Sequence, residues 1–149
     1  MNASTPWNSY RQIATQTAPP GQLILMLFDG ALNSMQRALQ GFDQAAPGSR
    51  NEIIHNNLRR AVDIIRHLNG SLNLEAGGEL AQTLRRLYHY FDTRLTESNL
   101  RKRREGIDEV IGQLSGIRDA WATMLDQKGR ETDLSQPTGS LLHSAADPV

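Results

Sequence analysis

Glu52 and His55 form the first pattern in this chain that has the residue types and spacing of a metal site. Their E-x-x-H step occurs on two helices of di-iron bundles, where the site also needs two further inward glutamates. This sequence has no second E-x-x-H step, and the apolar stripes described below contain no acidic residue. We therefore interpret both residues as solvated positions at the start of a helix, and we predict no metal and no cofactor.

The other polar patterns do not assemble an active site. Residues 101–104 are all basic (Arg-Lys-Arg-Arg) and lie near a predicted helix end, where cations complement the helix dipole. We favour a solvated corner here, with a contact site as the alternative. Gly77 and Gly78 lack the sequence context of a phosphate loop. The histidines are scattered, His67 and His89 are expected to be exposed, and nothing suggests a Ser-His-Asp set. The sequence predicts no enzyme.

Composition narrows the class of protein further. The chain has 149 residues, 16 Lys+Arg against 16 Asp+Glu, and no cysteine. Its length suits one domain, and zero net charge argues against nucleic-acid binding. The longest apolar run, residues 23–28, is far shorter than the about 20 residues of a membrane-spanning helix. The N-terminus does not resemble a secretory signal. We expect a cytoplasmic protein that binds neither nucleic acid nor membrane.

Four segments, residues 21–42, 51–74, 79–100 and 105–126, must supply the fold. In each, apolar residues alternate at spacings of three and four, the seam pattern of helical bundles, and no segment shows the period of a strand. The predicted stripes are Ile24, Phe28, Ala31, Met35, Ala38 and Phe42; Ile54, Leu58, Ala61, Ile65, Leu68 and Leu72; Leu80, Leu84, Leu87, Phe91 and Ser98; and Ile107, Val110, Leu114, Ile117, Trp121 and Met124. We predict an all-α, antiparallel up-down four-helix bundle.

The segments between and around these helices complete the organisation. Residues 1–20 are predicted to be an N-terminal arm with a short helix or turn, residues 21–126 the bundle domain, and residues 127–149 a disordered tail. Pro47 to Ser49 should end the first helix, with Ser49 or Asn51 capping the second. The pair Gly77-Gly78 should close the second helix, and Glu79 should open the third.

An apolar surplus lies off the predicted core stripes. Leu23 and Met26 fall on the outer side of the first helix, Gly30 also projects outward, and Ile53 and Ile64 are off the stripe of the second. A surface helix is not apolar all round unless something covers it. Either the arm folds back and Trp7, Tyr10 and Ile13 cover the patch, or a partner helix occupies a groove there. The two interpretations are compatible.

At this point two motifs resemble a known family. Tyr10, residues 17–24 (TAPPGQLI) and residues 26–31 (MLFDGA) are similar to the opening signature of the flagellar secretion chaperones, the FliS family. Residues 71–73 (SLN) and 77–81 (GGELA) match a second block, and the resemblance covers about residues 7–126. Pro19 stands where the family usually has serine, and Asn73 where it commonly has aspartate.

The resemblance implies a cytosolic chaperone that binds the C-terminal segment of flagellin, prevents its premature polymerisation and helps deliver it to the flagellar type III export apparatus. It also implies that Tyr10 and the neighbouring Trp7 contact the export gate or cover the groove. The predicted partner-binding residues are Trp7, Tyr10, Ile13, Leu23, Met26, Leu27, Gly30, Ile53 and Ile64. A homodimer is possible. The alternative function is a non-chaperone helical bundle that acts in interaction or regulation by self-association.

Overall fold

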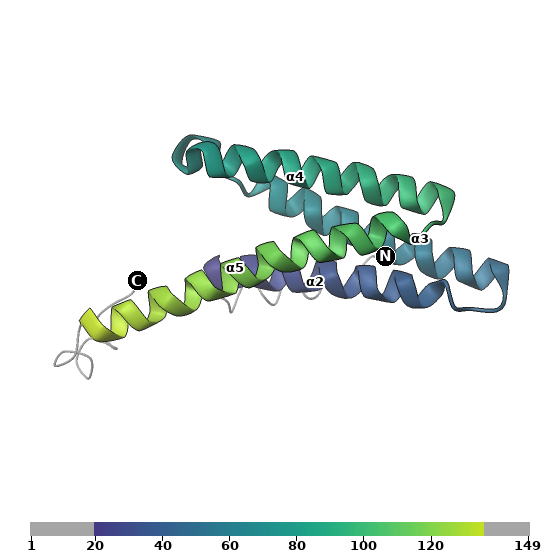
Figure 1. Cartoon of the computed structure of the whole chain (residues 1–149), viewed down its shortest axis with the longest axis horizontal. Coiled ribbons are helices and arrows are strands. Elements are labelled where there is room, and N and C mark those ends of the chain that lie inside the picture. The colour runs from purple at the N-terminus through teal and green to yellow at the C-terminus, as the bar shows by residue number, and fades with distance from the viewer. Residues whose placement is uncertain (1–19, 136–149) are drawn as a thin grey trace, which may run out of the picture.

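Four antiparallel helices form one bundle in the computed structural model, which describes residues 20–135, with side chains as far as residue 130 (Figure 1). They are α2 (Pro20–Gly41), α3 (Pro47–Gly70), α4 (Leu74–Arg101) and α5 (Glu105–Ser135). Each helix packs mainly on two neighbours: α2 and α4 both contact α3 and α5. The part of the chain described contains no strand. The predicted all-α bundle is confirmed.

The helix ends differ in detail from those predicted. α3 begins at Pro47, and its N-cap residue Ala46 makes no side-chain capping bond, so the prediction that Ser49 or Asn51 caps it is wrong. Proline suits this position because the first N–H groups of a helix have no intrahelical partner. The side chain of Asn73 accepts a hydrogen bond from the Ala76 N–H at 3.0 Å and caps α4. Aspartate would cap the same site equally well.

Gly78 interrupts α4 rather than separating it from α3. α3 already ends at Gly70, so the prediction that Gly77 and Gly78 close it, with Glu79 opening the next helix, is wrong. Gly78 has φ 57° and ψ −134°, a conformation that essentially only glycine adopts. The short turn from Leu74 to Gly77 is therefore set at an angle to the rest of α4.

The core stripes of α2 and α3 are close to those predicted. The buried residues include Phe28, Ala31 and Met35 from α2 and Ile54, Leu58 and Ile65 from α3. Ile64 is also buried, at 1% exposure, so its placement off the core stripe is wrong. A Cβ on Gly30 would lie 3.3 Å from Ile64 Cδ1, and one on Gly41 would lie 2.7 Å from Ile53 Cγ2. Because these two glycines have no side chain, α3 approaches α2 closely and buries a wider face.

The stripe on α4 is one residue out of register in its first half. The buried residues of this helix are Ala81, Tyr88, Phe91, Leu95 and Ser98. Leu80, predicted to be core, is 69% exposed. With half-buried Leu84, the observed stripe keeps the spacing of three and four residues through the helix. The predicted stripe contains neighbouring leucines in place of the small Ala81 and the amphipathic Tyr88.

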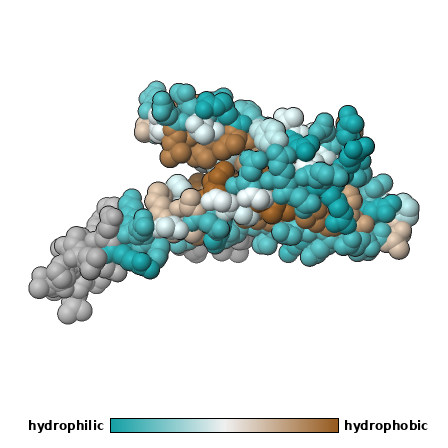
Figure 2. Space-filling model, viewed as in Figure 1, coloured by the Kyte–Doolittle hydropathy of each residue, from teal (hydrophilic) through white to brown (hydrophobic). Residues whose placement is uncertain are grey.

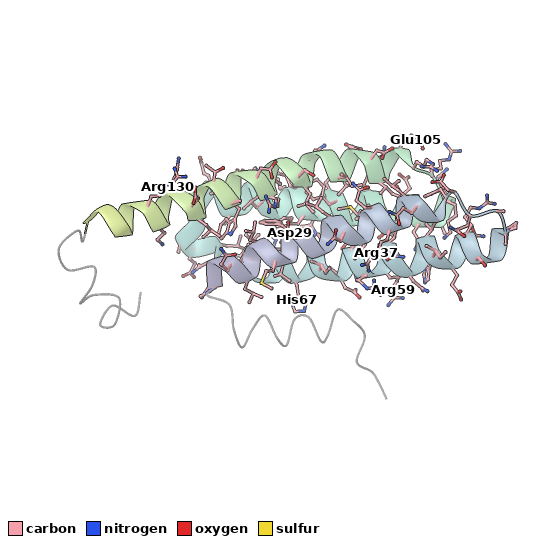
Figure 3. The ribbon with its side chains drawn as sticks, turned by 90° about the horizontal axis from the view of Figure 1, so that it is seen from below. Asp29, Arg37, Arg59, His67, Glu105 and Arg130 are labelled. Carbon is pink, nitrogen blue, oxygen red and sulfur yellow. The ribbon has the colours of Figure 1, made fainter. Side chains whose placement is uncertain are left out.

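α5 continues past the predicted end of the bundle at residue 126. It runs to Ser135, and in Figure 3 the label on Arg130 marks the part that projects beyond the other helices, whereas Glu105 marks its other end. Residues 127–135 of the segment predicted to be a disordered tail are thus helical. An ion pair one turn apart, between Arg130 Nη2 and Asp126 Oδ2 at 2.9 Å, supports this extension. Met124, predicted to be core, is 43% exposed because little packs on this end of α5.

None of the helices described between residues 20 and 135 is long and apolar enough to span a membrane.

Candidate functional site: an open groove between the helices

A cavity of about 390 Å³ opens at the end of the bundle where α4 begins. Residues of all four helices line it, among them Phe28, Leu68, Leu80, Leu84, Ile117 and Trp121. Figure 2 shows hydrophobic side chains on both sides of the cleft between the first turns of α4 and the helices below. We call this cavity the open groove. Its size is in the range of protein sites that hold a ligand or a few side chains of a partner.

The groove has no charged wall. The described side chains that line it include no Asp, Glu, Lys, Arg or His. Tyr88 is the one titratable residue among them, and burial raises the pKa of its hydroxyl to about 12. That hydroxyl therefore keeps its proton at neutral pH. An uncharged apolar groove suits the hydrophobic face of a helix or an extended apolar segment, and provides nothing to hold a phosphate or a metal ion.

One wall of the groove is fixed by contacts between α2 and α5. The indole N–H of Trp121 donates a hydrogen bond to the carbonyl of Gly21 at 2.9 Å. The rings of Trp121 and Phe28 meet edge to face with centroids 6.5 Å apart. Further along, Arg118 Nε lies 2.8 Å from Asp29 Oδ1, and Figure 3 labels this aspartate on α2. These contacts tie the start of α2 to the second half of α5.

The beginning of α4 forms the other wall. Among the described residues, the side-chain bonds that join α4 to other helices lie further along this helix. Glu109 of α5 accepts a hydrogen bond from the Tyr90 hydroxyl at 2.6 Å and one from Arg94 Nε at 2.7 Å. The hydrogen bond from Tyr90, followed by that from Arg94, lowers the pKa of the Glu109 carboxyl. Arg66 of α3 pairs with Asp92 at 2.8 Å. Because all of these ties lie beyond Tyr88, α4 diverges from α5 toward its N-terminal end and leaves Leu80 exposed.

The predicted partner-binding residues do not lie together in the open groove. Leu27 and Ile64 are buried in the core, at 6% and 1% exposure. Their neighbours on this face are half-buried, namely Leu23, Met26, Gly30 and Ile53. The remaining predicted residues, Trp7, Tyr10 and Ile13, lie outside the described residues. Gly30 lies against the side chain of Ile64 of α3.

The groove residues were missed because the sequence assigned most of them to the core. Leu80, Leu84, Ile117 and Trp121 all belong to the predicted stripes, and a stripe does not distinguish a filled core from a cleft between diverging helices. Gly78 is the one signal nearby, since a glycine pair inside an apolar pattern marks a break.

The other candidate patterns lie outside the lining of the open groove. Glu52 and His55 are exposed, and the described residues contain no group of three or more potential metal ligands. His67 and His89 are exposed as predicted, and in Figure 3 His67 points away from the bundle. In the basic corner, Arg104 pairs with Asp43 at 2.8 Å and lies 5.0 Å from the centre of the Phe42 ring. Lys102 Nζ donates to the carbonyl of Asn99 at 2.6 Å.

Comparison with known proteins places this architecture in a family. The family model described as flagellar protein FliS matches residues 3–128. The chain belongs to the FliS family. It is 41% identical over 126 residues to the flagellar secretion chaperone FliS of Salmonella typhimurium, covering 81% of this chain and 90% of that protein. It is 31% identical over 131 residues to FliS of Bacillus subtilis (88% and 94% covered) and 35% identical over 133 residues to FliS of Escherichia coli (84% and 93% covered).

The family assignment confirms the resemblance drawn from the two sequence motifs. Every residue that lines the open groove of this FliS-family chain lies within the matched range. The groove is therefore part of the FliS domain itself. FliS proteins are flagellar secretion chaperones, a class that acts by binding a protein partner.

Proposed function

We propose that this chain is a cytosolic export chaperone for flagellin. It binds the C-terminal segment of flagellin, keeps that segment from polymerising prematurely and helps deliver it to the flagellar type III secretion apparatus. The observation that carries the proposal is the open groove, an uncharged apolar cleft in a FliS-family bundle. With Leu80 left 69% exposed at its edge, the groove offers apolar surface that a partner helix would cover.

The mode of binding follows from the shape and chemistry of the groove. An amphipathic helix of flagellin would lay its apolar face between the start of α4 and the wall formed by α2 and α5. A segment that is disordered before binding loses conformational entropy when it orders, and this cost offsets part of the contact energy. Such a complex keeps water away from the segment and still releases it without ATP.

Two further parts of the proposal concern the N-terminal arm and self-association. Trp7 and Tyr10 are proposed to contact the export gate or to cover a binding surface, together with Ile13. Leu23, Met26, Gly30 and Ile53 would form the adjoining surface on α2 and α3. A homodimer that buries the groove would be the resting form under the alternative, self-associating function.

Isothermal titration with the C-terminal segment of the cognate flagellin tests the proposal. We expect a one-to-one complex, a negative heat-capacity change from apolar burial, and an affinity that changes little with salt because the groove has no charged lining. Removal of residues 1–18 should tighten binding if the arm is a cover. Absence of binding, combined with concentration-dependent oligomers in light scattering, would contradict the proposal and favour self-association.

A further inference from the structure

A second cavity opens at the other end of α4, where the chain turns into α5. Its volume is about 370 Å³, and the charged side chains in its lining are Arg94, Glu97, Arg101, Arg103 and Glu105. We call this cavity the basic recess. Figure 3 labels Glu105 at this end of α5 and Arg130 toward the opposite end. The basic recess shares no lining residue with the open groove, so a ligand in one cavity leaves the other free.

The turn between α4 and α5 draws Arg103 back against the end of α4. Lys102 is in the left-handed conformation, with φ 53° and ψ 59°, and the N–H of Arg103 donates to the Ser98 carbonyl at 3.1 Å. A left-handed residue followed by this hydrogen bond is typical of a Schellman helix end. Gly106 then lets α5 begin close to α4, because a Cβ there would collide with the Ser98 side chain. Backbone geometry therefore holds the two helix ends around the recess.

Two of the three arginines in the recess retain hydrogen-bonding capacity for a ligand. Arg94 is engaged within the bundle, with Nε 2.7 Å from Glu109 Oε1 and Nη1 3.3 Å from Glu97 Oε1. Arg101 approaches Glu97 only to 3.9 Å, which is too long for a hydrogen bond. The exposed guanidinium of Arg103 makes no ion pair or hydrogen bond with the residues that the structure describes. Arg101 and Arg103 thus offer two unsatisfied guanidinium groups beside one cavity.

The beginning of α5 adds positive potential to the same place. Gly106 lines the recess as the second residue of this helix, and the N–H groups of a first turn have no intrahelical acceptor. The partial positive charge at a helix N-terminus favours anionic groups nearby. Glu105 offsets part of this charge, so the arginines remain the main attraction for an anion.

We propose that the basic recess docks an acidic segment of a second protein partner, whose Asp or Glu carboxylates are held by Arg101 and Arg103. A planar guanidinium matches a carboxylate through two parallel hydrogen bonds. The inference is independent of the proposed function, because the client surface lies at the other end of α4.

A protein segment suits the recess better than a nucleic acid does. Glu97 and Glu105 would repel a continuous row of phosphates, whereas the N–H groups of a peptide can donate to their carboxylates. The described lining contains no aromatic ring on which a base could stack. The whole chain also has no net positive charge to attract a polyanion.

Peptide titrations followed by NMR test the inference. The isotope-labelled full-length protein is titrated, in about 50 mM NaCl, with a peptide of alternating Glu and Ser and with the same peptide carrying Gln in place of Glu. We expect only the acidic peptide to shift the backbone amide signals of Arg103 and Gly106 and the side-chain Nε–H signals of Arg101 and Arg103. The amide signal of Leu80 in the open groove should stay in place. Raising NaCl to about 200 mM should weaken binding several-fold, because salt screens exposed charges.

Two variants and a matched control locate the site. Arg103→Gln and Arg101→Gln should each raise the Kd of the acidic peptide about 3- to 10-fold, the effect of losing one charge-assisted contact at an exposed site. Arg59→Gln is the control, since Arg59 is exposed on α3, lies outside the recess and makes no ion pair in the described part of the chain (Figure 3). It removes the same charge, and its Kd should match that of the wild type.

Several results would overturn the proposal. An equal rise in Kd for Arg59→Gln would reduce the binding to an effect of net charge. Absence of binding by the acidic peptide, or signal shifts centred away from the basic recess, would show that the recess does not hold carboxylates. Tighter binding of an oligothymidylate with the same number of charges would assign the recess to nucleic acid instead.

Discussion

Replacement of Leu80 by alanine should weaken client binding without weakening the fold. The side chain is 69% exposed at the edge of the open groove, so the free protein gains little from it. Full burial of a leucine side chain contributes about 1.5–3 kcal/mol, and about two-thirds of that remains available for a client to bury. The expected loss of binding free energy is therefore about 1–2 kcal/mol, or a rise of about 5- to 30-fold in Kd.

Leu100→Ala provides the control for this experiment. Leu100 lies on the same helix and is 83% exposed, but it does not line the groove. Alanine and leucine are both good helix formers, so neither change should disturb α4. Both variants are titrated with the flagellin segment, and their unfolding is followed in urea. Equal effects of the two substitutions on Kd, or a loss of stability confined to Leu80→Ala, would refute the reasoning that places the client in this groove.

Three further predictions concern the frame that holds the groove open. In urea titrations, Gly106→Ala should lower the free energy of unfolding by about 1–3 kcal/mol, because a Cβ there would collide with α4. Gly112→Ala is the control: it has open space around it and should leave the free energy of unfolding unchanged or raise it by up to about 1 kcal/mol. Gly78→Ala should cost about 1–3 kcal/mol in the same assay and also weaken client binding, since φ 57° strains alanine and the first turn of α4 must shift; unchanged stability would contradict the assigned conformation. Glu109→Gln should be less stable than wild type at neutral pH. The pKa of the Glu109 carboxyl is lowered in the folded state, so its stabilisation is present above the unfolded-state pKa and disappears as pH falls through the folded-state pKa. The free energies of unfolding of wild type and Glu109→Gln should therefore converge in acid. A difference in stability that persists in acid would exclude ionisation of this carboxylate as its cause.

The bundle itself was predictable because helical periodicity is a strong signal over long segments. The stripes of α2 and α3 identified Phe28, Met35, Leu58 and Ile65 as core, and all four are buried. The prediction weakened where a stripe contained residues of mixed character. On α4, Ala81 and Tyr88 are buried although the neighbouring leucines are more hydrophobic. Hydrophobicity alone does not reveal which of two neighbouring residues faces the partner helices.

The candidate site was harder to predict because it depends on how two helices diverge. The sequence pattern places Leu80 and Leu84 in the core. The angle between α4 and α5 depends instead on the kink at Gly78 and on the hydrogen bonds of Glu109, and the pattern reveals neither. Those ties join residues distant in sequence, and no local pattern encodes them. The extension of α5 to Ser135 was missed for a different reason: the composition of residues 127–149 was judged as one window, although its first part contains good helix formers.

Site-specific photo-crosslinking tests most directly whether flagellin occupies the open groove. The chain has no cysteine, so Leu80→Cys and Leu100→Cys each provide a single attachment point for a thiol-reactive photo-crosslinker. After illumination with full-length flagellin, we expect capture from position 80, mapped by mass spectrometry to the C-terminal segment of flagellin, and little capture from position 100. Efficient capture from position 100 with none from position 80, while the complex still forms, would contradict the account.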